Sequence, residues 1–215
     1  MCSGNRDRSR AAGRGWLGVV CAGLGLLFAL GTAGPAWAYE QRTNTPSVGF
    51  QMGGGLMWGS DAYQFSPQTD EIPYDIFEGG FGLGIHIRYS LDRRSAIGAT
   101  FEDLRFRTKS GSGYPQDEYQ VNNFLARYYV YFARRSKISR YLVGGIGFHR
   151  PSIRDGDESS LPGEGFSANL GAGLEYFLTR VITIDGSIDG YMLRPKGGSI
   201  TAAEAKVGLH YYFTR

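Results

Sequence analysis

The sequence predicts an all-β fold: an eight-stranded antiparallel up-and-down transmembrane β-barrel that follows a cleaved export signal. Three observations predict it. The first 38 residues have the three-part organisation of a secretory signal peptide. The rest of the sequence contains no apolar run long enough for a transmembrane helix. It shows instead an alternation of apolar and polar residues, in eight segments separated by turn-rich stretches.

The predicted signal peptide covers residues 1–38. An arginine-rich stretch precedes an apolar one, and Gly34-Pro35 then breaks any helix. Ala36-Trp37-Ala38 provides the small residues of a cleavage site. An uncleaved membrane anchor is the alternative, because the apolar stretch approaches the length of a span. The helix-breaking pair directly before the cleavage site favours cleavage after Ala38, which leaves residues 39–215 as the barrel domain.

The net charge of +3 belongs to the signal peptide rather than to the barrel domain. The whole chain has 23 basic and 20 acidic residues, and residues 39–215 have 19 of each. This balance argues against a nucleic-acid partner. Both cysteines, Cys2 and Cys21, also lie in the signal peptide. The mature chain therefore has neither a disulfide framework nor a thiolate metal site, and we expect no metal and no cofactor.

The eight alternating segments are each about 10 to 15 residues long, which suits strands that cross a membrane at a tilt. In the second segment, bulky apolar residues at odd positions from Phe81 to Tyr89 oppose Gly82, Gly84, His86, Arg88 and Ser90. The expected strands cover residues 47–58, 79–90, 96–107, 119–133, 141–150, 165–177, 181–193 and 200–213.

The third segment changes phase around Glu102-Asp103. Ile97, Ala99 and Phe101 share a face before this point, whereas Leu104 and Phe106 would fall on the other face after it. A β-bulge inserts one extra residue and restores the phase. We therefore expect a bulge at Glu102-Asp103 that returns Leu104 and Phe106 to the apolar face.

Alternation alone does not show which face points outward, since a soluble lipocalin-like barrel would enclose its apolar face. The polar face here is rich in glycine and small residues, which suits the narrow interior of eight strands and would destabilise a solvated outer face. Aromatic residues gather near the segment ends, as in the two girdles of membrane barrels. We therefore expect the apolar face outside, with girdles formed by Tyr89, Phe132, Tyr141, Tyr176, Tyr211 and Phe213 and by Trp58, Phe81, Phe106, Phe148 and Phe166.

Short and long connections alternate along the chain. An even-stranded barrel has both termini and its short turns in the periplasm and its long loops outside the cell. The short turns are basic and the long loops acidic. Basic turns suit anionic phospholipid head groups, so we expect outer-membrane lipids, phospholipid and lipopolysaccharide, as partners of the barrel.

The last segment carries a family resemblance. Lys206, Gly208, Tyr211 and Phe213 have the spacing of the outer-membrane β-signal, although the chain ends two residues later at Thr214-Arg215. With the signal peptide and eight strands, the mature chain resembles the outer-membrane β-barrel domain family of OmpA-, OmpX- and OmpW-like proteins. This resemblance implies an outer-membrane location. It also implies biogenesis through periplasmic chaperones and the barrel-assembly machinery, which would read this segment.

Charged residues of both signs fall on the face expected to line the interior. An unpaired buried charge is costly, so these residues should pair. Because eight strands leave little room for water, we interpret the set as a plug of ion pairs, with a gated ion path as the alternative. The candidates are Arg88, Glu102, Arg127, Glu175, Asp185, Asp189, Glu204 and Lys206, accompanied by His86 and His210.

Three functions are compatible with these features. We favour a structural or interaction barrel that displays its loops, with a narrow porin-like channel for small or hydrophobic solutes as the alternative. A lipid A-modifying enzyme would need a membrane-facing Ser–His pair near the outer rim. His149 and Ser152 lie there, but Pro151 should end the strand between them, and the His-x-Ser-Asn pattern of such enzymes is missing. We therefore expect no enzyme and interpret His149 as an interfacial polar residue.

The cleavage site can be tested on the protein extracted from membranes. N-terminal sequencing should begin at Tyr39, because the A-x-A pattern ends at Ala38. A sequence that begins at Met1 would show that the leader is retained as an anchor.

Overall fold

The computed structural model describes residues 43–59, 79–107, 118–132, 137–154, 164–194 and 200–213. The predicted signal peptide and its cleavage site lie outside these residues. Within them, no helix is long and apolar enough to cross a membrane.

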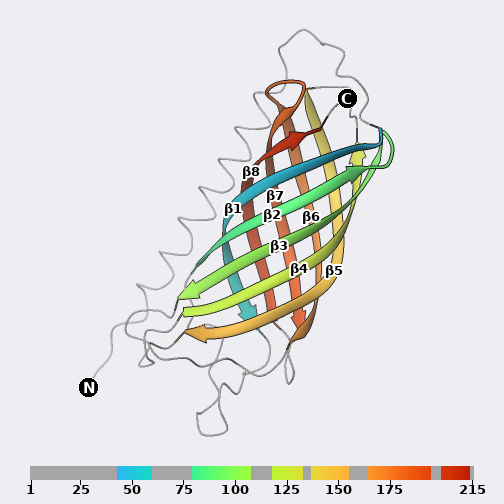
Figure 1. Ribbon diagram of the computed structural model, residues 1–215. Coiled ribbons are helices and arrows are strands. Elements are labelled where there is room, and N and C mark those ends of the chain that lie inside the picture. Colours follow the sequence, from blue (N-terminus) through green and yellow to red (C-terminus); the bar gives the residue numbers. More distant parts are fainter. Residues whose placement is uncertain are drawn as a thin grey trace, which may run out of the picture. The chain divides into compact units, whose positions relative to one another are not determined.

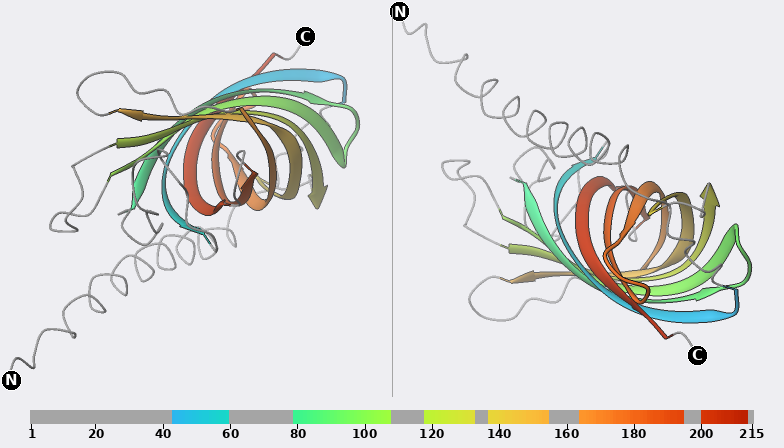
Figure 2. Two further views of the ribbon diagram at one scale, coloured as in Figure 1. Left: turned by 90° about the horizontal axis from the view of Figure 1, so that it is seen from below. Right: turned by 90° about the horizontal axis from the view of Figure 1, so that it is seen from above.

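Eight strands form one closed barrel in which each strand pairs with its neighbours in the sequence and β1 pairs with β8 (Figure 1, Figure 2). All pairings are antiparallel. The predicted all-β, eight-stranded up-and-down barrel is confirmed. The strands are β1 (Thr45–Gly59), β2 (Gly80–Ser90), β3 (Ser95–Arg107), β4 (Glu118–Phe132), β5 (Ile138–Arg154), β6 (Gly165–Phe177), β7 (Ile182–Arg194) and β8 (Ile200–Tyr212).

The connections define the two ends of the barrel. We call the end with connections 91–94, 133–137 and 178–181 the turn end, and the other, with 60–79, 108–117, 155–164 and 195–199, the loop end. β1 starts and β8 finishes at the turn end, which is the upper end in Figure 1. Because β1 pairs with β8, the first and last strands both have two neighbours, and the sheet has no open edge whose backbone groups would need hydrogen bonds from the surroundings.

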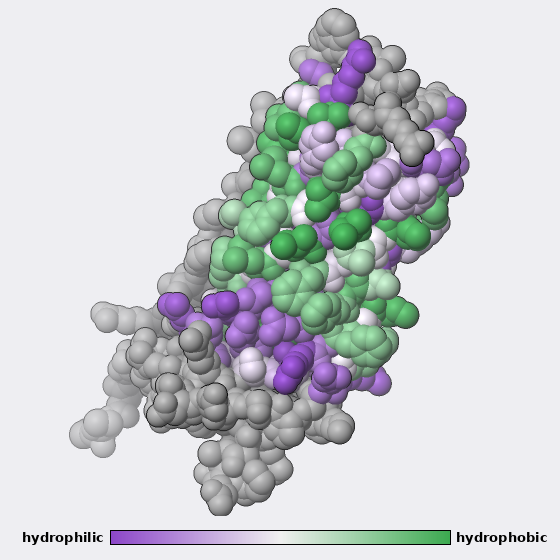
Figure 3. All heavy atoms as spheres, viewed as in Figure 1, coloured by the Kyte–Doolittle hydropathy of each residue, from purple (hydrophilic) through white to green (hydrophobic). Residues whose placement is uncertain are grey.

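Outward-facing side chains form an apolar band. In β2, Leu83, Ile85 and Ile87 are 39%, 54% and 59% exposed, while Gly84, His86 and Arg88 between them are buried. Figure 3 shows the band on one face of the barrel, with hydrophilic residues at its loop end. The apolar face is therefore outside, as expected for a barrel whose surroundings are hydrocarbon.

The prediction of a β-bulge in β3 is wrong. β3 pairs residue for residue with β4 from Ser95 to Arg107, and its alternation continues without a change of phase. Leu104 and Phe106 are consequently inside, at 3% and 2% exposure. The reason is that β3 extends past the apolar band. There the outer face is hydrophilic, so charged residues such as Arg105 point outward and apolar ones point inward.

The expected aromatic girdles need two corrections and leave one residue untested. Phe106 and Tyr141 face the interior, the latter because its hydroxyl reaches a buried carboxylate. The side chain of Trp58 lies outside the described residues. Tyr176 is half-buried. The other predicted aromatics are exposed on the outside, namely Tyr89, Phe132, Tyr211 and Phe213 near the turn end and Phe81, Phe148 and Phe166 near the loop end.

Pro151 does not end its strand, which also corrects an expectation. β5 continues to Arg154, and Pro151 lies opposite Val121 of β4. On the other side, pairing with β6 ends at His149. Among the described residues, none pairs with β5 on this side beyond His149, and a proline without an N–H group is tolerated at such an edge.

The orientation of β3 can be tested by cysteine labelling. If the mature chain starts at Tyr39 it has no cysteine, so a single introduced one gives an unambiguous signal. Arg105→Cys and Arg107→Cys should react with a water-soluble maleimide in the folded barrel, because both positions face outward beyond the apolar band. Leu104→Cys and Phe106→Cys should react only after unfolding. The reverse labelling pattern would show that Leu104 and Phe106 face outward, as a β-bulge at Glu102-Asp103 would require.

Candidate functional site in the barrel interior

The interior gathers the charged residues that the sequence singled out. All eight ion-pair candidates face inward, and none is more than 7% exposed. They come from β2, β3, β4, β6, β7 and β8 and form two clusters along the barrel. Alternation explains this placement, since every second residue of each strand must point into the enclosed space.

The first group, which we call the Arg88 cluster, contains Arg88, Glu175 and Asp185. One guanidinium nitrogen of Arg88 lies 2.5 Å from Glu175 Oε1, and the other lies 3.5 Å from Asp185 Oδ2. The guanidinium carbon also lies 4.2 Å from the centre of the Tyr129 ring. One cation therefore serves two carboxylates and one aromatic face, which is a use suited to the planar arginine side chain.

Neutral donors complete the hydrogen bonding of both carboxylates in the Arg88 cluster. The Tyr212 hydroxyl donates to Glu175 at 3.0 Å. The Tyr141 hydroxyl donates to Asp185 at 2.9 Å, and the Gln51 amide donates to it at 2.8 Å. Such partners offset part of the large cost of removing a charge from water.

The second group, the Lys206 cluster, contains two cations and three carboxylates. Lys206 Nζ lies 2.7 Å from Glu102 Oε1 and 2.8 Å from Asp189 Oδ2. An Arg127 nitrogen lies 2.8 Å from the same oxygen of Glu102. The Tyr191 hydroxyl lies between these groups, donating to Glu102 at 2.9 Å and accepting from Lys206 at 2.5 Å.

Glu204 is the least strongly paired member of the Lys206 cluster. Its nearest cation, Lys206 Nζ, is 3.6 Å away. Glu204 lines a small pocket together with Gly82 and Leu104. The volume of this pocket is about 10 Å³, which is room for one water molecule at most. Across both clusters, the five carboxylates exceed the three cations by two.

Apolar side chains fill the interior at the loop end. This apolar cluster combines residues from β1, β3, β4, β7 and β8. It explains why Leu104 and Phe106 point inward, because they pack there rather than against lipid. Its members are Met57, Leu104, Phe106, Tyr119, Val121, Leu125, Tyr191, Leu193, Ile200 and Ala202.

Two histidines meet beside the Arg88 cluster. His86 Nε2 lies 2.6 Å from His210 Nε2, and the ring centres are 3.9 Å apart. Gly49 of β1 faces them, and a Cβ atom there would overlap both rings. The position therefore requires glycine because of close packing, and not because of a special backbone conformation.

Glu175, Asp185 and His210 also have the residue types of a metal site. One ligand atom of each lies within 4.8 Å of the others. The Arg88 guanidinium already contacts both carboxylates, however, so the positive charge at this point comes from the protein. A bound divalent cation would have to displace that contact.

His149 and Ser152, the residues considered for an enzyme, do not form a pair. His149 is 1% exposed and faces the interior, whereas Ser152, three residues along the same strand, faces the outside. The interpretation of His149 as an interfacial residue is therefore wrong. The residue paired with His149 on β4 is Asn123, whose side-chain oxygen accepts a hydrogen bond from the Ser167 hydroxyl of β6 at 2.8 Å.

The proposed assembly-signal residues fall on both faces of β8 and on Phe213, the residue that follows it. Lys206 is an interior ion-pair residue, and Gly208 lies so close to β1 that a Cβ atom would overlap the Phe50 carbonyl and the Gln51 side chain. Tyr211 and Phe213 are 46% and 51% exposed on the outside, with ring centres 5.1 Å apart.

Three tyrosines of the Arg88 cluster were not identified from the sequence, namely Tyr129, Tyr131, whose hydroxyl accepts from Arg88 at 3.3 Å, and Tyr141. Tyr129 and Tyr131 could have been found, since they share a face with Arg127 two and four residues earlier in β4. Tyr141 carries no such signal, because aromatic residues near a strand end occur in girdles as well as in interiors.

Comparisons with known proteins agree with this architecture. The family model of the outer membrane protein β-barrel domain matches residues 24–213. The crystal structure of Neisserial surface protein A is similar, with a TM-score of 0.59 and 14% identity over 78% of this chain and 97% of that one. The crystal structure of Ail, the attachment invasion locus protein of Yersinia pestis, is also similar. Its TM-score is 0.51, with 16% identity over 80% of this chain and 100% of that one. No curated protein matches.

The family match covers most of the chain and confirms the resemblance that the β8 segment and the eight strands predicted. At these identities the solved structures show the fold alone. The protein is therefore located in the outer membrane, and the chain belongs to the outer membrane protein β-barrel domain family.

Proposed function

We propose that the protein is a non-conducting barrel with a structural and interaction role in the cell envelope. In this role the strands anchor it in the membrane and the loop end is displayed at the cell surface. The observation that carries the proposal is the filled interior, where the Arg88 cluster, the Lys206 cluster and the apolar cluster occupy successive levels. A solute would have to break buried ion pairs and cross an apolar level.

The outer surface of β3, β4 and β5 near the loop end supports an interaction role. The side chains here are polar and lie beyond the apolar band (Figure 3). Arg105 bonds Asp103 at 2.7 Å and lies 3.6 Å from Glu118 on the neighbouring strand. Such a hydrophilic sheet extends past the hydrocarbon region into the head-group or aqueous zone. It would present a rigid surface, next to the loops, to lipopolysaccharide or to a partner outside the cell.

We assign the turn end to the periplasm. Short turns face the periplasm in outer-membrane barrels, and the described turns carry Arg93, Arg94 and Arg180 on their exposed surface. Arginines at this level can contact anionic phospholipid head groups of the inner leaflet.

A narrow channel is the second candidate, and the interior charge favours it in one respect. Five carboxylates against three cations would attract cations to any path that opened. The apolar cluster opposes this function, because apart from two tyrosine hydroxyls its side chains have no polar groups that could replace the hydration of an ion.

Conductance in planar bilayers separates the two candidates. The purified wild-type barrel should give no large, stable single-channel steps, in contrast to a porin of the same membrane measured in parallel. Large cation-selective steps from the wild-type protein would overturn the plug and establish the channel.

A second proposal concerns assembly. Lys206, Gly208, Tyr211 and Phe213 are read by the barrel-assembly machinery, after periplasmic chaperones have kept the chain unfolded. The two outward aromatics are available for this, since they contact no interior group.

Phe213→Asp tests the assembly signal, and Phe132→Asp is a matched control. Both phenylalanines are outward residues at the turn end, with exposures of 51% and 49%, so both should lose a similar amount of lipid contact, about 1–3 kcal/mol. Only Phe213 belongs to the signal. Phe213→Asp should therefore reduce the heat-modifiable barrel in outer-membrane fractions much more than Phe132→Asp does. Equal losses would reduce the role of Phe213 to lipid contact.

A further inference from the structure

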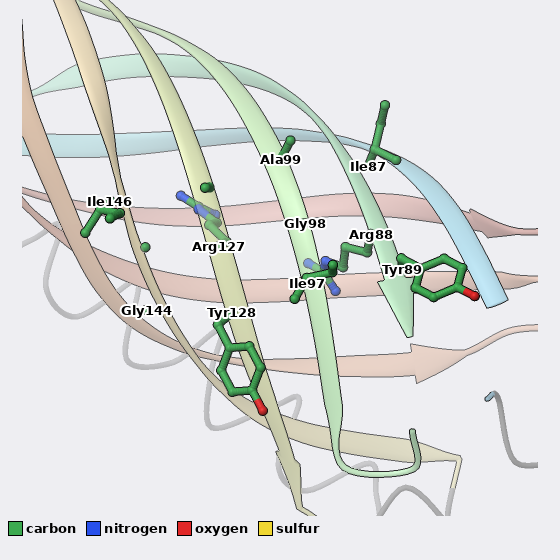
Figure 4. A pocket seen from close by; sticks show the side chains of 12 residues that line it. Ile87, Arg88, Tyr89, Ile97, Gly98, Ala99, Arg127, Tyr128, Gly144 and Ile146 are labelled. Atoms are coloured by element: carbon green, nitrogen blue, oxygen red, sulfur yellow. The ribbon is translucent and has the colours of Figure 1, made fainter. Parts of the chain in front are cut away.

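The described part of the lipid-facing surface contains an open depression on strands β2 to β5. Its floor is formed by short side chains at directly paired positions, Ala99 of β3 and Ala126 of β4. Ile87 and Ile146 flank this pair at the same level on β2 and β5. Figure 4 shows Ile87, Tyr89, Tyr128 and Ile146 around the depression, which has a volume of about 680 Å³. We call it the Ala99–Ala126 depression.

The neighbouring residue pairs of β3 and β4, towards the loop end and towards the turn end, limit the extent of the depression. Towards the loop end, Phe101 and Phe124 pair with ring centres 4.7 Å apart. Towards the turn end, Ile97 pairs with Tyr128, and Tyr128 pairs with Gly144, which leaves a gap on the β5 side. The depression therefore opens towards lipid, and at its turn end it reaches Tyr89 and Ile97, on the two strands that residues 91–94 connect.

The distance of the depression from the turn end, measured along the membrane normal, matches the length of the hydrocarbon chains of one leaflet. Ala99 lies five residues from Arg94, which is about 16 Å along the strand and about 12 Å along the membrane normal at the usual tilt. Half of the hydrocarbon core is about 15 Å thick. A chain that starts from a head group near Arg94 would therefore end in the depression.

The charge of the β2–β3 turn, beyond the turn end of the depression, favours one class of head group. Arg93 and Arg94 are exposed in the turn that joins β2 and β3. The carboxylate of Asp92 in the same turn accepts from the backbone nitrogens of Arg94 and Ser95, at 2.6 and 2.8 Å. These hydrogen bonds cap the turn, and its two arginines against one aspartate leave it basic, which favours an anionic head group.

We propose that the Ala99–Ala126 depression binds one acyl chain of an anionic phospholipid whose head group is held by Arg93 and Arg94. A flexible chain fills a concave surface that would otherwise lose van der Waals contacts, and this packing is what drives association within a bilayer. A second copy is less suited, since a two-fold contact through this face would bring the same arginines of both copies together.

Phospholipid retention measured by native mass spectrometry tests the chain site. The barrel is released from nanodiscs that contain phosphatidylglycerol and phosphatidylcholine. The wild type should retain one phosphatidylglycerol. Ala99→Phe and Ala126→Phe fill the floor and should lower the singly bound population about fivefold, equivalent to about 1 kcal/mol. Ala172→Phe, on the lipid-facing surface of β6, is the matched control and should change nothing.

The head group is tested by Arg94→Ser against Arg180→Ser in another turn. Arg94→Ser should reduce the preference for phosphatidylglycerol over phosphatidylcholine about fivefold, and Arg180→Ser should not. Only variants with the wild-type heat-modifiable mobility are compared. Equal retention by Ala99→Phe, Ala126→Phe and the Ala172→Phe control would overturn the chain site. An unchanged preference of Arg94→Ser for phosphatidylglycerol over phosphatidylcholine would overturn the head-group assignment. Barrel dimers that form in the wild type and disappear in Ala99→Phe would show that the depression is a contact between two copies instead.

Discussion

Pairing of buried charges is the constraint on which the rest of this barrel depends. Lys206, Arg127 and Arg88 each contact more than one carboxylate in a space that excludes bulk water. Removing a charge from water costs several kcal/mol per ion, so each must keep its partner. The partners come from strands far apart in the sequence, such as β3 and β8 for Glu102 and Lys206. The ion pairs are therefore satisfied only when the barrel is closed and the strands are in register.

This constraint acts together with the strand period of two. A shift of one residue in the register of β8 would move Lys206 and His210 to the lipid and Val207 and Leu209 to the interior. The mixture of a charged interior and an apolar outer surface thus defines one register. The proposed function rests on the same arrangement, because an interior occupied by ion pairs and apolar side chains favours the surfaces over a central path as the places where other molecules would bind.

Much of this arrangement could be predicted from the sequence. Alternation identified the eight strands to within a few residues at most ends, and it placed Arg88, Asp185 and Lys206 on the inner face. It failed where the environment of a strand changes along its length. Leu104 and Phe106 in β3 pass beyond the lipid, so apolar residues there no longer indicate the outer face, and a bulge was predicted in error. Tyr141 was assigned to a girdle because the sequence does not show its distant partner, Asp185 of β7. The choice of partners within each cluster likewise depends on the folded register.

The most direct test of this account is a double-mutant cycle on Arg88 and Glu175, measured as the free energy of unfolding in lipid vesicles by urea titration. Arg88→Met alone should cost about 3–5 kcal/mol, because two carboxylates lose their buried cation. Together with Glu175→Leu, the double variant should be more stable than the sum of the single effects predicts, with a coupling energy of roughly 1–3 kcal/mol. Single effects that add within about 0.5 kcal/mol would contradict the account, since they would show that the two side chains do not depend on each other.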